Sequence, residues 1–478
     1  MKRALFACVV MVAACSGDTG PAGPAGPAGP AGTNGTDGTN GTDGTNGSNG
    51  ANGNDVIISD TAKHGLDISP VAIDTTGMTA AQIEAIGEGS YLVNALADCG
   101  GCHGEAGTTP GFLAGTTAMG TFNARNLTPD ATTGMQLTET QFIDVMHNGT
   151  NYLCSGGTCT ADTHTLKVMP WADYRWAGKA DLQAIYAYLR AIPAVSNQVA
   201  ADTGTLGGAP TTYPTSYTDG AVTRPLPAEA DANGVAIPDP GYVRRGKAIQ
   251  PLNDLSSLDP AIDARIGRGA YLVTALGGCN NCHTNPPRTN GKITTAAYMT
   301  GGRVFSIALA AQPTTGTVRS MSVDLVGRNN GYFGESDATF SSFEGIIQTG
   351  VHIDDPNAPL LAAPMPWQHL RYLTVDDLAA IFTYLQFVQT QQPTQLTTDK
   401  ATQDASYYCA ADTDCDALNG GNAGVETCDL TPANATYHEC VGRSCVVDSD
   451  CRVCQTCTGT AGSKTCGGPI SATCASGI

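Results

Sequence analysis

The chain has 478 residues, enough for two to four domains at roughly 100–200 residues per domain. Its 43 acidic residues outnumber 24 basic ones, and the resulting formal charge of −19 excludes a nucleic-acid binder, because a run of phosphates would stay unneutralised. Charged residues make up only 14% of the chain while cysteines number 18, a composition typical of exported proteins. Beyond the first residues no run of 18 apolar residues occurs, so we expect no transmembrane helix.

The first residues have the pattern of an export signal. Lys2 and Arg3 precede a short apolar run, which predicts a signal peptide over residues 1–15. The run ends in Val-Ala-Ala-Cys, which resembles the bacterial lipobox, so Cys15 is the predicted lipidation site. Cleavage as an ordinary signal peptide is the alternative. Ser16 follows the cysteine, and in similar lipoproteins the absence of Asp there favours the outer membrane. We expect an exported protein, held to the membrane by its lipid alone and facing the periplasm or the cell exterior.

A glycine repeat follows the signal peptide. Glycine recurs at every third position from Gly17 to Gly53, as the crowded axis of a collagen triple helix requires. Proline is confined to the early triplets, which weakens a triple helix. We therefore expect residues 16–55 to form a collagen-like, extended spacer, and a trimer formed through this segment is the alternative.

The middle of the chain contains an internal repeat. Residues 86–103 match residues 266–283 position by position, at an offset of 180. Farther along, Met-Pro-Trp at 169–171 recurs at 365–367, at an offset of 196. Two copies of one module are therefore predicted.

Each copy ends in an amphipathic helical pattern, which begins at Asp181 in the first copy and at Asp377 in the second. Thr374, three residues before Asp377, predicts an N-terminal capping box. The fold class we predict is mainly α. The modules are assigned to residues 79–197 and 251–390, joined by a linker at 198–250 that is rich in Pro, Gly and Thr.

Each module carries one Cys-x-x-Cys-His unit. The two units are Cys99, Cys102 and His103, and Cys279, Cys282 and His283. This motif is the attachment signature of c-type haem, in which both thiols form thioethers and the histidine ligates the iron. Two covalently bound haem c groups are therefore predicted. The alternatives are two zinc motifs or two thioredoxin-like redox motifs.

A second axial ligand is expected on the other side of each iron. Met169 and Met365 are the candidates, because Met/His ligation suits electron transfer and only Met-Pro-Trp repeats in register. The competing residues are Met119, Met135, Met146, His147 and His164 in the first copy, and Met299, Met321, His352 and His369 in the second.

The combined motifs resemble a known family. They are Gly-x-Tyr-Leu-Val before Cys-x-x-Cys-His, then Arg-Asn-Leu-Thr-Pro-Asp at 125–130, then Met-Pro-Trp-Ala-Asp-Tyr. Together they are similar to the class I cytochrome c domains in the multihaem cytochrome subunits of bacterial membrane-bound alcohol and sugar-acid dehydrogenases. The resemblance covers over half the chain. Those subunits usually carry three such domains and this chain has two motifs, so the dehydrogenase partnership does not transfer safely.

The resemblance implies a fold in which the first and last helices of each module cross around the haem. Gly89 and Gly269 are the expected points of close approach, with Tyr186 and Tyr188 as partners in the first copy and Phe382 and Tyr384 in the second. The first copy is closer to the family. In the second, Arg319 and Asp324 are kept, but the residues between them depart from the pattern.

The last segment, residues 408–478, holds ten cysteines and few aromatic residues. In an exported chain this composition predicts a small disulfide-rich domain with up to five bridges of undetermined connectivity. Thiolate binding of a metal by Cys451, Cys454 and Cys457 is the alternative. Cys154 and Cys159, which bracket a short Gly-rich loop, are expected to form a disulfide.

The function expected from these features is electron transfer. Two six-coordinate haems leave no open position for a substrate, so we expect a non-enzymatic carrier that relays single electrons between a redox-protein donor and acceptor, neither of which the sequence identifies. The resemblance leaves open that the carrier is the cytochrome subunit of a dehydrogenase. The alternatives are a dihaem peroxidase-type enzyme and a surface interaction protein with accessory haems.

Overall fold

The computed structural model describes residues 57–391 with gaps, and four short strands between residues 427 and 467. The gaps are 106, 116–117, 120, 219–222, 232–236, 238, 253–259, 290–291, 309–316, 327–331, 335–337, 351–360 and 362–364. The predicted signal peptide with Cys15, the spacer and most of segment 408–478 lie outside the described residues. No helix within the described ranges has the length and apolar character needed to cross a membrane.

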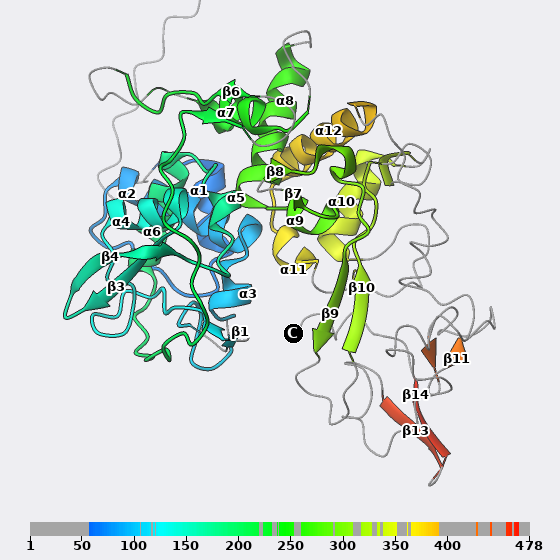
Figure 1. Cartoon of the computed structure of the whole chain (residues 1–478), viewed down its shortest axis with the longest axis horizontal. Helices are drawn as coiled ribbons and strands as arrows, with labels where there is room; N and C mark the ends of the chain where they lie inside the picture. Colours follow the sequence, from blue (N-terminus) through cyan, green and yellow to red (C-terminus); the bar gives the residue numbers. More distant parts are fainter. Residues whose placement is uncertain are drawn as a thin grey trace, which may run out of the picture. The chain divides into compact units, whose positions relative to one another are not determined.

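Most of the regular structure is helical and falls into two halves with the same order of elements (Figure 1). The first half contains α1 (Asp60–Asp67), α2 (Ala80–Tyr91) with its π-helical continuation η1 (Leu92–Leu96), α3 (Cys99–His103), α4 (Glu139–Asn148), α5 (Trp171–Tyr174) and α6 (Lys179–Ala191). The second half contains α7 (Val243–Ile249), α8 (Pro260–Tyr271) with η3 (Leu272–Leu276), α9 (Asn280–His283), α10 (Phe340–Thr349), α11 (Trp367–Leu370) and α12 (Val375–Gln391). The expectation of a mainly α fold is confirmed.

Glycine allows the first and last long helices of each half to cross closely. A Cβ on Gly89 of α2 would collide with the backbone carbonyl of Ala184 in α6, and a Cβ on Gly269 of α8 would collide with that of Ala380 in α12. These are the crossings predicted from the sequence. Of the expected partners, Tyr188 and Tyr384 pack at the crossing points.

Each half also has a shorter helix that the sequence analysis missed. Gly65 of α1 packs directly on Gly87 of α2, and Gly246 of α7 packs in the same way on Gly267 of α8. The assignment of residues 198–250 to a linker is therefore wrong at its end, because α7 belongs to the helical packing of the second half. The pattern was missed because α7 spans only seven residues, less than the window in which helical periodicity is visible.

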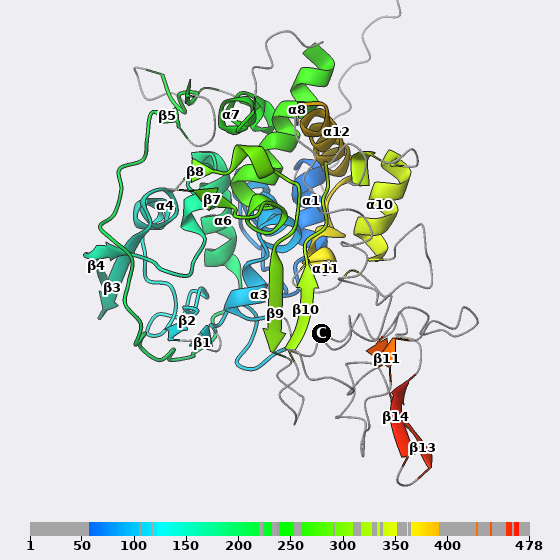
Figure 2. The same ribbon diagram turned by 45° about the vertical axis from the view of Figure 1, so that its right-hand side comes forward.

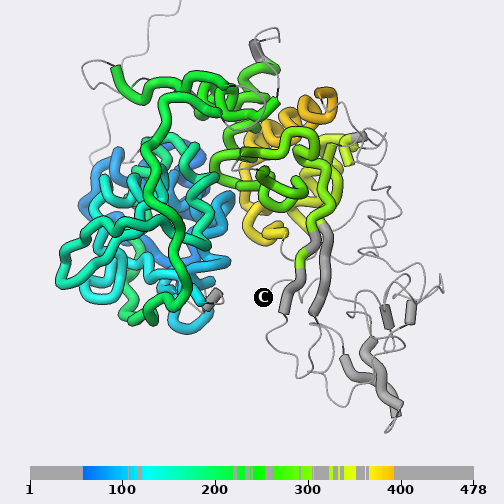
Figure 3. Tube along the Cα trace, in the orientation of Figure 1, coloured from blue at the N-terminus to red at the C-terminus, as the bar shows by residue number. Residues whose placement is uncertain are grey.

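The first part of the linker, residues 198–213, lies along the first half (Figure 3). The backbone N–H of Asn123 donates to Asp202 at 2.8 Å, and the N–H of Thr165 donates to the carbonyl of Gly208 at 2.7 Å. Tyr213 stacks on the ring of His147 at 4.0 Å between centroids. Hydrogen bonds and a ring contact thus hold residues 198–213 on the first half.

The described strands form antiparallel pairs. The β3–β4 hairpin (Thr150–Ser155 and Thr158–Thr165) belongs to the first half, and Figure 2 shows the β9–β10 hairpin (Val304–Ala308 and Thr317–Met321) in the second. Cys154 and Cys159 face each other in β3–β4 and form the expected disulfide. The other pairs are β1 (Ala118–Met119) with β2 (Phe122–Asn123), β5 (Ser216–Tyr217) with β6 (Arg224–Pro225), β7 (Arg288–Thr289) with β8 (Lys292–Ile293), β11 (Thr427–Cys428) with β12 (Cys440–Val441), and β13 (Thr456–Thr460) with β14 (Ser463–Gly467).

The two halves exchange equivalent hydrogen bonds. The Tyr91 hydroxyl donates to the carboxylate of Asp377 at 2.8 Å, and the Tyr271 hydroxyl donates to that of Asp181 at 2.6 Å. Tyr91 and Tyr271 are equivalent in the repeat, as are Asp181 and Asp377. The contact is therefore reciprocal, in the manner of an isologous dimer interface.

This exchange corrects the predicted capping box at Thr374. The Thr374 hydroxyl accepts the N–H of Asp377 at 3.2 Å, as expected. The Asp377 carboxylate does not return to the backbone of Thr374; instead it accepts two hydrogen bonds from Arg268, at 2.9 and 3.0 Å, besides the one from Tyr91. The contacts with Arg268 and Tyr91 thus replace the second hydrogen bond of the capping box.

Candidate haem-binding sites

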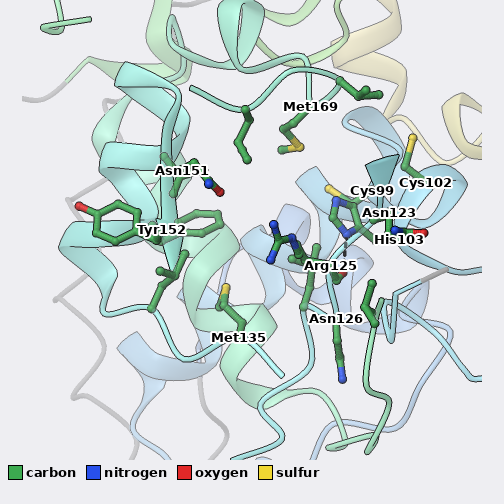
Figure 4. A pocket seen from close by; sticks show the side chains of 18 of the residues that line it. Cys99, Cys102, His103, Asn123, Arg125, Asn126, Met135, Asn151, Tyr152 and Met169 are labelled. Atoms are coloured by element: carbon green, nitrogen blue, oxygen red, sulfur yellow. Dashed lines mark hydrogen bonds between the residues drawn. The ribbon is translucent and has the colours of Figure 1, made fainter. Parts of the chain in front are cut away.

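The first half encloses a cavity of about 340 Å³. Its wall includes the predicted residues Cys99, Cys102, His103 and Met169 (Figure 4). The cysteines and the histidine come from α3, whose single turn places all three on the same wall. The remaining wall is largely apolar, with contributions from Leu127, Phe142, Ile185 and Leu189. The structure therefore brings every predicted site residue of the first module to one cavity.

His103 is oriented for ligation. Its side chain is buried, and Nδ1 lies 2.7 Å from the carbonyl oxygen of Arg125. Because a carbonyl only accepts, Nδ1 carries the proton and the lone pair is on Nε2. Burial lowers the pKa of His103, which favours the neutral ring. A ring nitrogen fixed in this way by a backbone carbonyl is the usual arrangement of a metal-ligating histidine.

His283 repeats this arrangement in the second half. It is buried, its Nδ1 donates to the carbonyl of Val323 at 3.0 Å, and burial again lowers its pKa. Val323 is thus the counterpart of Arg125. The expected equivalence of Arg319 with Arg125 is wrong.

The backbone register explains this correction. Leu127 N–H donates to the carbonyl of Leu113 at 2.8 Å, and Leu325 N–H donates to that of Met299 at 3.0 Å. This register makes Asp324 the counterpart of Asn126, a residue that lines the first cavity. The shift was hidden because the loop between the histidine and this segment is longer in the second half.

Burial raises the pKa of all four thiols, unlike that of a reactive redox motif. Burial raises the pKa of Cys99 and of Cys279 to about 12, whereas reactive Cys-x-x-Cys thiols have lowered values. Among the described residues none of the four is part of a disulfide. Besides burial, Asp98 and Glu105 raise the pKa of Cys102, and these two carboxylates converge with His369 rather than with the thiols.

Met169 enters the cavity from a segment fixed on both sides. The N–H of Trp171 donates to the Met169 carbonyl at 2.8 Å, and the indole N–H donates to the carbonyl of Leu166 at 3.2 Å. The indole lies against Gly149, the left-handed residue that ends α4, where any side chain would collide with it. Figure 4 shows the Met169 thioether directed into the cavity, with Met135 across from it.

Met365 is held by the same set of bonds. Trp367 N–H donates to the Met365 carbonyl at 2.9 Å, its indole N–H donates to the carbonyl of Leu361 at 3.1 Å, and the ring packs on Gly350 at the end of α10. Met365 is half-buried and packs against the core. The residues just before it, 351–360 and 362–364, are not among the described residues.

The competing ligands fall into three groups. Met135 and Met146 also line the first cavity. Four others make contacts elsewhere. His147 stacks on Tyr213 and bonds to the Ala177 carbonyl, and His164 contacts Asp162. Met299 is the buried counterpart of Leu113, and His369 contacts Glu105. The side chains of Met119 and Met321 and all of His352 lie outside the described residues.

Sequence reasoning missed two contributors to the site. The carbonyls of Arg125 and Val323, which orient the histidines, have no side-chain signal and follow only from the fold. Tyr174 also lines the first cavity, and its hydroxyl donates to the carbonyl of Ala97 at 2.8 Å. Its position within Met-Pro-Trp-Ala-Asp-Tyr was the available signal.

Comparison with known proteins gives two relatives at low identity, and no family model matches the chain. One is a component of the nicotinate dehydrogenase of Pseudomonas putida, 29% identical over 241 residues, which are 50% of this chain and 17% of that protein. The other is the gluconate 2-dehydrogenase cytochrome c subunit of Pantoea cypripedii, 26% identical over 355 residues, which are 71% of this chain and 67% of that protein. The chain thus spans about a sixth of the first relative and two thirds of the second. Both relatives are subunits of dehydrogenases, and the second is a cytochrome c subunit.

Proposed function

We propose that this protein is a dihaem c-type cytochrome that relays single electrons between redox proteins. The observation that supports it best is the pair of matched sites, in each of which a buried histidine is fixed by a backbone carbonyl and a methionine by the same tryptophan-anchored segment. The residues fit the group: two thiols for attachment, one imidazole and one thioether, with an apolar wall around the first set.

In this proposal the chain's residues bind and orient the cofactor and exclude water from it. Cys99 and Cys102 would attach the first haem, with His103 and Met169 as axial ligands. Cys279, Cys282, His283 and Met365 would do the same for the second. Haem iron with His/Met ligation supplies a reversible one-electron couple at a raised potential. With a histidine and a methionine held for each iron, the sites would leave no position for a substrate.

Location and anchoring belong to the same proposal. Cys15 would be lipidated, and residues 16–55 would hold the cytochrome away from an outer membrane. The donor and acceptor would be exported redox proteins, and a dehydrogenase is one candidate because both relatives are dehydrogenase subunits. A Cys15→Ala variant should leave the membrane fraction for the soluble one if the anchor is correct.

The experiment that tests the haem assignment is intact mass and pyridine haemochrome analysis of protein made with the haem-attachment machinery. Wild type should carry two haems. Cys99→Ser/Cys102→Ser and Cys279→Ser/Cys282→Ser should each carry one, whereas Cys154→Ser/Cys159→Ser, which removes a disulfide only, should keep two. One haem or none in the wild type would refute the proposal.

A further inference from the structure

A second ligand set lies outside the haem sites, at the junction of the two halves. Asp98, just before Cys99, and Glu105, two residues after His103, direct their carboxylates at one nitrogen of His369, which belongs to α11 of the other half. Nε2 of His369 lies 3.1 Å from Oδ1 of Asp98 and 3.1 Å from Oε1 of Glu105. The three side chains are between 24% and 37% exposed, so solutes can reach them.

The orientation of His369 is set from outside this cluster. Nδ1 lies 3.3 Å from the carbonyl of Asn94, to which it donates. Nε2 therefore faces the two carboxylates and is hydrogen-bonded to that of Glu105. A single N–H can serve two carboxylates only as a bifurcated hydrogen bond, and both distances exceed the 2.7–2.9 Å of charge-assisted hydrogen bonds. Both distances are close to the separation of two ligand atoms in a tetrahedral metal site, which is about 3.3 Å when each metal–ligand bond is about 2.0 Å.

The repeat has an equivalent junction, in which the first half supplies the α11-like position and the second half its partners. There the negative charge is neutralised by a side chain of the protein. Asp173, the counterpart of His369, accepts from Arg288 at 2.9 Å and from Asn281 at 2.6 Å, both on the opposite half. There a guanidinium of the chain neutralises the buried carboxylate. At the first junction no described Arg or Lys pairs with Asp98 or Glu105. Two carboxylates thus converge on one imidazole, and the cation that faces them is the protonated ring rather than a guanidinium.

We propose that Asp98, Glu105 and His369 bind a divalent transition metal such as Zn²⁺. Imidazole nitrogen and carboxylate oxygen are both zinc ligands, and open zinc sites combine three protein ligands with a water. The metal supplies the positive charge that Arg288 supplies at the other junction. Because the ligands come from both halves, the ion links α11 to the loops that flank α3. The site does not depend on the proposed electron-transfer function.

The test is zinc content per chain after equilibrium dialysis of the full mature protein with its cofactors attached. We expect His369→Ala and Glu105→Gln each to hold one zinc fewer than wild type. His164→Ala is the matched control, since His164 faces the single carboxylate of Asp162 at 3.3 Å and should retain the wild-type content. Zinc held by the cysteine-rich segment is common to all four proteins and cancels.

A second measurement covers a variant that folds poorly. Zinc should raise the thermal unfolding midpoint of wild type and of His164→Ala, with a rise that grows with zinc concentration, and should not do so for Glu105→Gln. Equal zinc content in all four proteins, or equal zinc stabilisation of wild type and Glu105→Gln, would overturn the proposal. The haem content is read independently, so a failure here leaves the electron-transfer proposal intact.

Discussion

The reciprocal tyrosines make the sharpest prediction about what holds the halves together. Tyr91→Phe and Tyr271→Phe each remove one hydroxyl and leave the ring in place. The Tyr91 hydroxyl donates to Asp377 and accepts the N–H of Thr374 at 3.1 Å. The Tyr271 hydroxyl donates to Asp181 and accepts the N–H of Gly178 at 2.9 Å. Each variant thus removes a hydrogen bond from a carboxylate and leaves a backbone N–H without its acceptor.

The magnitude follows from these two losses. A hydrogen bond to a charged group contributes about 1.5–3 kcal/mol, and a buried donor left unpaired costs about 1–3 kcal/mol. Because relaxation and water recover part of both, we expect each variant to lower the free energy of unfolding by about 2–4 kcal/mol. The effect should be larger for Tyr271→Phe, since Gly178 is buried and Thr374 is half-buried.

Urea unfolding of the full mature chain measures these changes. Tyr372→Phe is the control, because the Tyr372 side chain is 41% exposed and surface substitutions usually change stability by less than about 0.5 kcal/mol. In Tyr91→Phe/Tyr271→Phe, we expect the halves to unfold in separate transitions. If both single variants match Tyr372→Phe, the reciprocal contact contributes nothing and the reasoning is refuted.

Three further predictions concern packing, pH and the cysteine-rich segment. Gly269→Ala should cost about 1–3 kcal/mol or more by overpacking against the α12 backbone, while Gly208→Ala, which meets open space, should be neutral by the same denaturation assay. Burial raises the pKa of Asp181 to about 6, so the native state keeps a proton that the unfolded state releases near 3.8. The stabilisation that comes from this proton is present below pH 4 and is lost as the pH rises through 6. Denaturation across pH should therefore show a loss on the order of 3 kcal/mol between about pH 4 and pH 6.5 that is absent in Asp181→Asn. Cys457 and Cys466 lie directly opposite each other in β13 and β14, so non-reduced peptide mapping should find them disulfide-bonded; pairing with other cysteines would contradict the register.

The elements predicted most accurately were those that occur twice. Repeat matching located the crossing helices and their glycines, because Gly89 and Gly269 keep one offset from the attachment motifs. A single copy would have left Gly89 as one small residue among many. The repeat also selected Met169 over Met135, although the structure places both at the same cavity.

The failures lie where tertiary contacts override a local pattern. Asp377 has the position of a capping residue, but a bidentate contact with Arg268 and a tyrosine from the other half engage its carboxylate. Asp324 was assigned to the wrong position of the repeat. The structure aligns it with Asn126, because the preceding loop is longer in the second half, and no residue type reveals that difference. The contact of His369 with Asp98 and Glu105 joins residues more than 260 positions apart, a distance no spacing argument bridges.

The most direct test of the proposed function is an optical and EPR redox titration of the mature protein, followed by peroxide addition. We predict two low-spin haems with His/Met ligation that titrate reversibly and do not react with peroxide. Met169→Ala and Met365→Ala should each remove the methionine ligation of one of the two haems and leave the spectrum of the other unchanged. A high-spin haem in the wild type, or rapid peroxide turnover, would contradict the electron-carrier account and make that haem an active site.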